Sequence, residues 1–333
     1  MTIRFGILGA GRIGQVHAAA IAATPGATVT AVADAHAEAA ENIASAYNCE
    51  TSSIDEIAAN DSIEAVAICT PTDMHADQIE QFARAGKAIF CEKPIDLDVA
   101  RVQTCLQTVK DTGAPLMIGF NRRFDADFGA LHKSIRDGRI GDVESVIITS
   151  RDPGPPPISY IERSGGIFRD MTIHDFDIAR WMLGEEVETV FAQGSVLVDP
   201  EIGTAGDYDS AHVLLKTASG KQSVISNSRR ASYGYDQRIE VHGSKGMASA
   251  GNAHEARVEV ATTDGYTRPP LLDFFMQRYE GAYRAEIRAF VEAIQQKQTP
   301  PATGHDGLMA LVLAEAANRS VAEGRLIAVA EVL

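Results

Sequence analysis

Cysteine is scarce in this sequence, and the few thiols form no disulfide or metal-binding pattern. The 333 residues include four cysteines, none of them in a C-x-x-C pair. They are Cys49, Cys69, Cys91 and Cys105. Cys69 and Cys91 lie within apolar runs, as is typical of reduced thiols in the core of a cytosolic protein.

Basic residues and long apolar runs are also in short supply. The chain has 30 Lys and Arg against 45 Asp and Glu, a net charge of −15 at pH 7. This charge repels nucleic-acid phosphates and anionic lipid surfaces. No apolar stretch approaches the ~18 residues of a membrane span, and the first residues lack the basic segment and cleavage site of a secretory signal. We therefore expect a cytoplasmic protein with no nucleic acid or membrane partner.

A glycine pattern opens the chain. The apolar run Ile3–Leu8 has the composition of a strand, an alanine-rich helix follows, and G-x-G-x-x-G stands between them. In this context the glycines allow a tight turn, close approach to a pyrophosphate, and close helix–strand packing, while the helix N-terminus offers free N–H groups to the phosphates. The expected contacts to a dinucleotide are Gly9, Gly11, Arg12, Ile13 and Gly14.

A carboxylate ends the second expected strand. Asp34 follows "TVTAVA", twenty residues after Gly14, where such folds place the acceptor for the adenosine ribose hydroxyls. It would repel a 2′-phosphate, and the next Lys or Arg along the chain is Arg84. The pattern favours NAD over NADP. The alternative is that Asp34 only caps the next helix.

Strands and helices then alternate. Buried strands are expected at 65–69, 88–92 and 116–120, with helices between them, which predicts a doubly wound parallel sheet of the Rossmann type. Polar residues follow these strands, where such sheets bind ligands, although ordinary loop polarity explains each group taken alone. The expected cofactor contacts here are Thr70, Pro71, His75, Glu92 and Lys93. The polar residues that follow the expected strand at 116–120 are Asn121, Arg122 and Arg123.

After about residue 122 the strand candidates follow one another directly, with a hairpin turn at Ser219-Gly220. This predicts an α+β domain with one large, mainly antiparallel sheet and an early helix pair, and two closing helices are expected at 273–297 and 306–323. We expect a dinucleotide-binding domain over 1–121 and a second domain over 122–333, the closing helices being free to pack back on the first. One sheet face needs a cover, and a second subunit is a natural one.

The stretch "GGIFRDMTIHDFD" combines two carboxylates and an imidazole. Asp170, His174 and Asp177 stand at i, i+4 and i+7, on one stripe if the stretch is helical. A neutral imidazole is a suitable proton acceptor near pH 7. Two alternatives stay open: a solvated helix face, or a helix that starts at Ile173 through a Thr172-x-x-Asp175 capping box. The other histidines considered, His242, His254 and His305, lack companions at metal-ligand spacing, so no metal site is predicted.

Together, "GAGRIG", "EKP", "GFNRRFD" and "SGGIFRDMTIHDFDIARWMLG" resemble the glucose–fructose oxidoreductase / inositol dehydrogenase family over essentially the whole chain. The resemblance implies NAD-dependent oxidation of a ring secondary alcohol of myo-inositol, a small neutral polyol, to 2-keto-myo-inositol. It implies that Lys93, Asp170 and His174 act at the reacting hydroxyl. It places substrate contacts at Arg122, Asp152, Asp177 and Tyr235. Some relatives carry Asn in place of Asp152 and Met in place of Asn121, so the preferred isomer stays open.

Three other functions remain open at this level. The first is a dehydrogenase of another cyclic polyol or free sugar, such as scyllo-inositol or an aldose. The second is a non-catalytic NAD-sensing regulator, which would be expected to lose the lysine and histidine that this chain keeps. The third is a glycosidase that uses bound NAD for transient oxidation without net NADH formation. We expect a homo-oligomer, with a homotetramer favoured.

Overall fold

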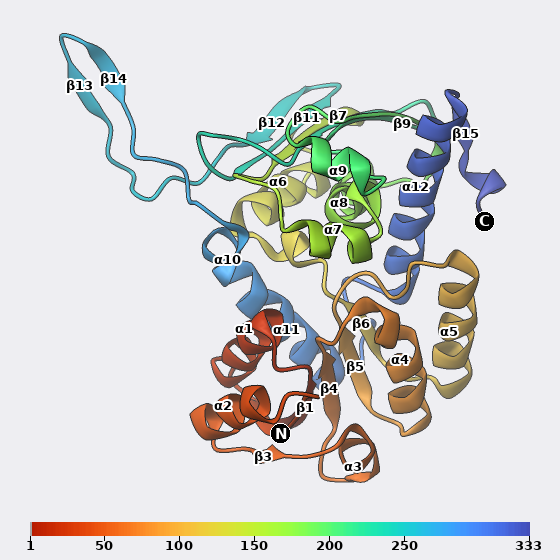
Figure 1. The fold of residues 1–333 in the computed structure, drawn as a ribbon. Coiled ribbons are helices and arrows are strands. Elements are labelled where there is room, and N and C mark those ends of the chain that lie inside the picture. Colours follow the sequence, from red (N-terminus) through yellow and green to blue (C-terminus); the bar gives the residue numbers. More distant parts are fainter. Residues whose placement is uncertain (1) are drawn as a thin grey trace. The chain divides into compact units, whose positions relative to one another are not determined.

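The computed structural model describes residues 2–333, and the chain packs as two units (Figure 1). The first unit contains the chain up to Phe124 together with Gly281–Met309. The second contains Asp125–Glu280 and Ala310–Leu333. A segment late in the sequence therefore belongs to the first unit.

The first unit is built on a six-stranded parallel sheet. Its order is β3-β2-β1-β4-β5-β6, with every neighbouring pair parallel. The strands are β1 (Ile3–Leu8), β2 (Ala27–Ala33), β3 (Glu50–Thr51), β4 (Ala65–Ile68), β5 (Ala88–Cys91) and β6 (Leu116–Ile118). The chain starts in the middle, runs outward to β3 and returns beside β1, so the strand order reverses between β1 and β4, the place where such sheets bind ligands. The expected doubly wound sheet is confirmed.

Helices of the first unit pack on this sheet. They are α1 (Arg12–Ala22), α2 (Ala37–Tyr47), α3 (Ile54–Ala59), α4 (His75–Arg84), α5 (Val99–Thr112) and α11 (Glu280–Gln296). The Phe290 ring of α11 meets Phe5 of β1 edge-on, with 6.1 Å between ring centroids. The single helix expected over 273–297 is wrong in its first part, because α10 (Phe275–Arg278) ends at Tyr279, whose backbone is not helical.

The second unit is built on a seven-stranded sheet of order β12-β11-β7-β10-β9-β8-β15. Its strands are β7 (Val143–Arg151), β8 (Val187–Ser195), β9 (Ser210–Thr217), β10 (Gln222–Ser228), β11 (Asp236–Gly243), β12 (Gly246–Ala250) and β15 (Ile327–Ala328). All neighbouring pairs are antiparallel except β7 and β10, which run parallel. Gly220, in the turn from β9 to β10, has φ +95°, a conformation that favours glycine. The expected mainly antiparallel sheet is confirmed.

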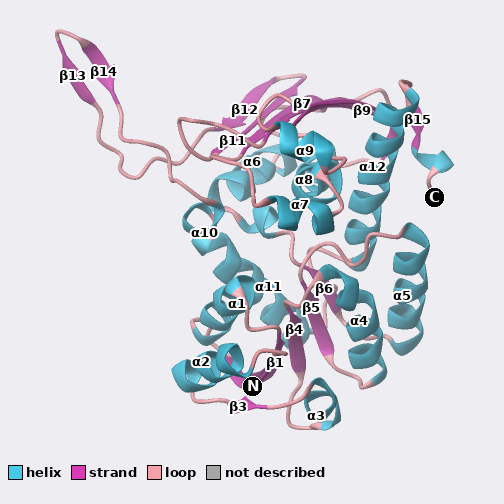
Figure 2. Ribbon diagram, viewed as in Figure 1, coloured by secondary structure: helices cyan, strands magenta, loops and turns pink. Residues whose placement is uncertain are grey.

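Helices line this sheet (Figure 2). They are α6 (Ala126–Arg136), α7 (Ile158–Ser164), α8 (Ile173–Leu183), α9 (Pro200–Thr204), α10 and α12 (Gly304–Glu323), the last beginning in the first unit. A separate hairpin of β13 (Val260–Thr262) and β14 (Gly265–Thr267) projects from the second unit as an arm. None of the helices described is long and apolar enough to cross a membrane.

Candidate active site

The glycine loop after β1 leaves room for a bound group at one position only. Gly9 has φ +92°, and a Cβ there would lie 2.6 Å from the carbonyl oxygen of Cys69. A Cβ on Gly14 would collide with the carbonyl oxygen of Gly9. Gly11, the N-cap residue of α1, has no atom within 4 Å of a would-be Cβ. The loop thus has a tight base and an open rim at a helix N-terminus, which fits a pyrophosphate.

Asp34 holds the glycine loop from the end of β2. Its Oδ2 accepts the backbone N–H of Ala10 at 2.6 Å, and its Oδ1 accepts the N–H of His36 at 2.7 Å. His36 is the N-cap of α2 and makes no side-chain cap bond. Asp34 is therefore not the cap of α2, and its carboxylate is fixed beside the loop where the ribose hydroxyls are expected.

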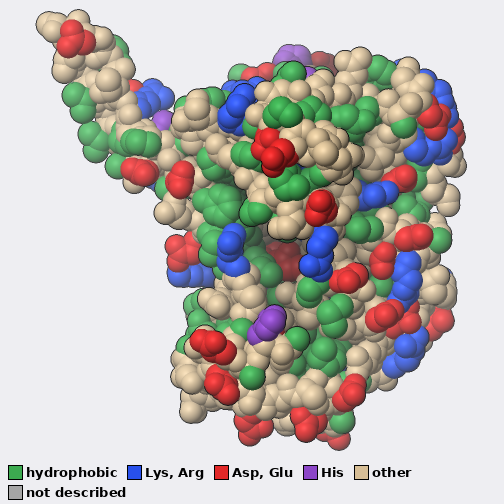
Figure 3. Space-filling view, in the orientation of Figure 1, with side chains coloured by type: hydrophobic (Ala, Val, Ile, Leu, Met, Phe, Trp, Pro, Cys, Tyr) green, Lys and Arg blue, Asp and Glu red, His purple; other side chains and the backbone are tan. Residues whose placement is uncertain are grey.

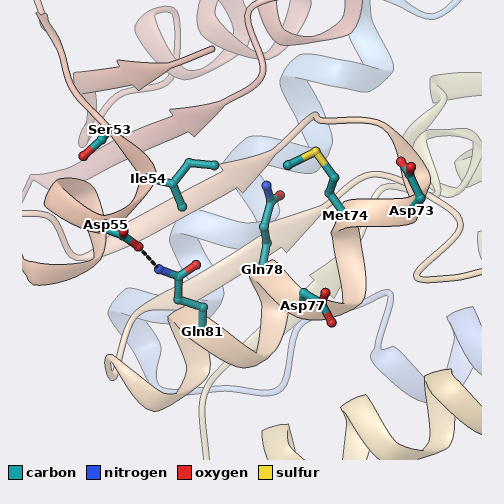
Figure 4. Close-up of a pocket in the computed structure, with 8 residues that line it drawn as sticks. All are labelled: Ser53, Ile54, Asp55, Asp73, Met74, Asp77, Gln78 and Gln81. Atoms are coloured by element: carbon teal, nitrogen blue, oxygen red, sulfur yellow. Dashed lines mark hydrogen bonds between the residues drawn. The ribbon is translucent and has the colours of Figure 1, made fainter. Parts of the chain in front are cut away.

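A surface pocket of about 450 Å³ opens in the first unit between the start of α3 and the start of α4 (Figure 4). It is lined by Ser53, Ile54, Asp55, Asp73, Met74, Asp77, Gln78 and Gln81. Asp55 accepts a hydrogen bond from Gln81 at 2.8 Å across the pocket. Three of the lining residues are aspartates and none is Lys or Arg, so the pocket suits neutral or cationic groups better than phosphate.

His75 joins the ends of β4 and β5. Its Nδ1 lies 2.8 Å from the carbonyl oxygen of Pro94, and its Nε2 lies 2.8 Å from that of Thr70. A neutral ring can donate to one of these oxygens and a protonated ring to both. The residue is buried at the first position of α4. Both ring nitrogens of His75 are thus engaged by residues that follow β4 and β5, so the ring is not available as a base.

Glu92 and Lys93 follow β5 directly, and Arg122 follows β6. Glu92 Oε1 lies 2.6 Å from Nε2 of His17, a buried residue of α1 that the sequence analysis did not single out. Arg122 is itself buried, in the short helix Asn121–Phe124.

In the second unit, Asp170 lies in a π-helical turn, Phe168–Thr172, that runs directly into α8. It is therefore outside the α-helix that carries His174 and Asp177. The helix does begin at Ile173, as one alternative held, but the Thr172 hydroxyl makes no cap bond and instead donates to Asn227 at 2.7 Å. The helix start of this alternative is confirmed, whereas its capping box is wrong.

The Asp170 carboxylate is held by two side chains that sequence reasoning missed. The Tyr160 hydroxyl donates to its Oδ1 at 2.8 Å, and Arg229 contacts its Oδ2 at 3.5 Å. Burial and the negative charge of Asp170 raise the pKa of Tyr160, which keeps its hydroxyl a donor. Arg229 is fully buried and also contacts Asp207, which accepts the N–H of Ile167 at 2.8 Å. This network fixes the orientation of Asp170.

The expected substrate-binding residues occupy different environments. Asp177 in α8 is 1% exposed, and the neighbouring Asp175, fully buried, accepts from Asn227 at 2.8 Å. Asp152 directly follows β7, where its N–H donates to the carbonyl oxygen of Ser228 at 2.9 Å. Tyr235 is buried, and its ring meets that of Tyr279 edge-on at 6.0 Å.

A parallel sheet with a glycine loop after its first strand and a carboxylate after its second is typical of a dinucleotide-binding domain. Residues 3–120 match the model of an oxidoreductase family with an NAD-binding Rossmann fold, and residues 128–249 match the GFO/IDH/MocA C-terminal domain. The chain belongs to the GFO/IDH/MocA oxidoreductase family. The family resemblance seen in the sequence and the expected NAD cofactor are confirmed.

Relatives with inositol dehydrogenase names match this chain over nearly its whole length. It is 64% identical over 330 residues to the inositol 2-dehydrogenase of Rhizobium meliloti, covering 99% of this chain and all of the relative. It is 44% identical to the myo-inositol 2-dehydrogenase of Thermotoga maritima, covering 99% of this chain and 100% of that one. The crystal structure of a myo-inositol dehydrogenase from Corynebacterium glutamicum superposes with a TM-score of 0.95 at 41% identity, covering 98% of this chain and 99% of that one.

Proposed function

We propose that this protein is an NAD-dependent inositol 2-dehydrogenase that oxidises a ring CH–OH of myo-inositol to 2-keto-myo-inositol. The observation that carries the proposal is the 64% identity, over full length, to a relative of that name. Candidate polar groups at the ends of β4, β5 and β6, and in the π turn and α8, support it. We infer that residues 1–121 bind NAD and that residues 122–333 provide substrate contacts and the surface between subunits.

We propose that the first unit holds NAD by its glycine loop and by Asp34. Gly11 and the N-terminal turn of α1 would receive the pyrophosphate, and the Asp34 carboxylate would accept from the adenosine ribose. The further contacts are assigned to Arg12, Ile13, Thr70, Pro71, His75, Glu92 and Lys93. When bound, NAD supplies the nicotinamide ring that accepts a hydride.

His174 is the proposed proton acceptor for the substrate hydroxyl. Asp170, held by Tyr160 and Arg229, would stabilise the imidazolium that forms, as a carboxylate does for the histidine of a serine-protease triad. Lys93 would donate to the reacting oxygen and stabilise its partial negative charge. These assignments require Lys93 and His174 to meet at the same hydroxyl.

Arg122, Asp152, Asp177 and Tyr235 are the proposed contacts to the other ring hydroxyls. Carboxylates accept from neutral hydroxyls and repel phosphate, so a phosphorylated sugar is a poor candidate. A second candidate substrate is scyllo-inositol, because a 35% identical relative from Bacillus subtilis is named scyllo-inositol 2-dehydrogenase (NAD(+)).

A homo-oligomer, with a homotetramer favoured, is proposed from exposed apolar side chains on the second unit. Val224 lies between its cross-strand neighbours Ile147 and Leu214, and all three are exposed. Val260 and Tyr266 on the projecting arm are exposed as well, and Figure 3 shows hydrophobic side chains along this arm. Patches of this kind typically mark a protein interface.

Three buried, unpaired cysteines favour a reducing, cytoplasmic location.

The proposal is tested by measuring NADH formation from a panel of neutral and phosphorylated polyols. Myo-inositol is expected to give the highest kcat/KM, and inositol monophosphate and a hexose 6-phosphate are expected to be inert. NADH formation from a phosphorylated sugar, with myo-inositol inert, would refute the substrate. Tight NAD binding without net NADH formation from any polyol would favour a regulator or a glycosidase.

A further inference from the structure

Three elements of the first unit bring titratable side chains together at Glu92, the residue that precedes Lys93. His17 comes from α1, Glu92 from the end of β5 and Glu286 from α11, and one ligand atom of each lies within 4.8 Å of the others. Glu286 is 0% exposed, and neither of its carboxylate oxygens has a hydrogen-bond partner among the described residues. Glu92 of this His17–Glu92–Glu286 triad is a proposed cofactor contact, whereas His17 and Glu286 have no role in the proposed reaction.

The surroundings of the triad are apolar. The rings of Phe90 and Tyr283 lie against the His17 ring, at 4.8 and 5.6 Å between centroids. Burial raises the pKa of the neighbouring Cys69 thiol, and the negative charge of Glu92 raises it further. No Lys or Arg forms an ion pair with Glu286 in the part of the chain described. Two ionised carboxylates in such a site would repel each other with little solvent screening, which favours the protonated form of the more deeply buried one.

The two carboxyl groups differ in burial and in partners. The Glu92 side chain is 14% exposed, and its Oε1 lies 2.6 Å from Nε2 of His17. Burial raises the pKa of Glu286 well above its usual range, and the charge of Glu92 raises it further. Glu286 is therefore the neutral member.

Glu92 is fixed at the end of β5 by its backbone and its side chain. Its backbone N–H donates to the carbonyl oxygen of Ile68 at 3.0 Å. Its carboxylate packs over Gly119, where a Cβ would lie 3.2 Å from Oε2. The next residue is Lys93, the proposed hydrogen-bond donor of the reaction.

We propose that Glu286 is protonated at pH 7 and so keeps a single carboxylate charge in the triad, beside the strand end that carries Lys93. The effect on turnover rests on the proposed function. The protonation itself does not, so the two can fail separately.

The test uses Glu286→Gln, a neutral isostere of the protonated acid. Glu292→Gln is the matched control, because Glu292 is exposed on the same helix. At saturating NAD and myo-inositol, Glu286→Gln is expected to keep kcat within about threefold, because it preserves the neutral state of the side chain. The infrared band of a protonated carboxyl at pH 7 should disappear in Glu286→Gln and persist in the control.

Thermal unfolding gives a second readout that needs no substrate. A buried acid with a raised pKa contributes stability that is lost as the pH rises above its unfolded-state pKa, because only the unfolded chain then releases the proton. Tm of Glu286→Gln should therefore rise relative to wild type between pH 5 and 9, whereas the Glu292→Gln difference stays flat. The other titratable groups facing Glu286 are His17, Cys69 and Glu92, which all variants retain.

Four outcomes would overturn the proposal. They are an unchanged infrared band in Glu286→Gln, a flat Tm difference with pH, a loss of kcat well beyond threefold in Glu286→Gln, and a stoichiometric Zn, Mn or Fe ion retained by wild type but lost in Glu286→Gln. The last would identify the triad as a metal site. If wild type forms no NADH from any inositol, the proposed function fails, while the infrared and Tm measurements still decide the protonation.

Discussion

Replacing Gly11 by alanine should separate cofactor affinity from stability. Gly11 has φ −65° and ψ −168°, which any residue adopts, and its would-be Cβ meets no atom within 4 Å. The new methyl group therefore costs the fold little. It stands, however, on the open rim of the loop at the N-terminus of α1, where the backbone must approach the pyrophosphate closely.

The size of the effect follows from the interaction removed. A hydrogen bond to a charged group contributes about 1.5–3 kcal/mol, so losing one phosphate contact should raise Kd for NAD by roughly 10- to 150-fold. Without NAD, Tm should change by less than about 2 °C, since an N-cap Gly→Ala change is worth about 1 kcal/mol or less. Isothermal titration with NAD and calorimetric melting of the apoprotein measure the two quantities.

Gly14→Ala is the contrasting variant. Its Cβ would collide with the carbonyl oxygen of Gly9, so it should lower Tm of the apoprotein as well as affinity. The reasoning is refuted if Gly11→Ala binds NAD as tightly as wild type, or if it lowers Tm as much as Gly14→Ala does.

The other predictions concern catalysis, cofactor choice and assembly. His174→Ala should lower kcat by about 10²–10⁴ while NAD still binds in titration, because a positioned base is lost; near-normal turnover would exclude His174 as the base. NADP should give a far lower kcat/KM than NAD, since its 2′-phosphate would meet the Asp34 carboxylate; comparable values would contradict this. Val224→Lys, in the exposed apolar row of the sheet, should shift the mass measured by light scattering toward the monomer, whereas the already polar and exposed Gln222→Lys should not; an unchanged mass for Val224→Lys would move the interface elsewhere.

Local patterns along the chain were sufficient for much of the fold. The glycine spacing, the apolar strands of the first unit and the Ser219-Gly220 turn are set by neighbours in sequence, because strand burial and turn conformation depend on residues a few positions apart. Asp34 and the "EKP" stretch could be found for the same reason. Each lies directly after a strand that its own composition reveals.

Tertiary structure decided what depends on distant segments. The parallel pairing of β7 with β10, the return of α11 to the first unit, and the π turn that carries Asp170 have no local signature. Tyr160 of α7 and Arg229 after β10 reach Asp170 from different parts of the chain, and Asp207 contacts Arg229, so only packing reveals this network. A partial signal existed for Glu286, a charge on the apolar stripe of α11 with Tyr283, Ile287 and Phe290. The sequence alone could mark Glu286 as unusual on this stripe. Its neighbours His17 and Glu92 lie more than 190 residues away in the chain. Only folding brings the Glu92 carboxylate close enough to favour the protonated form of Glu286.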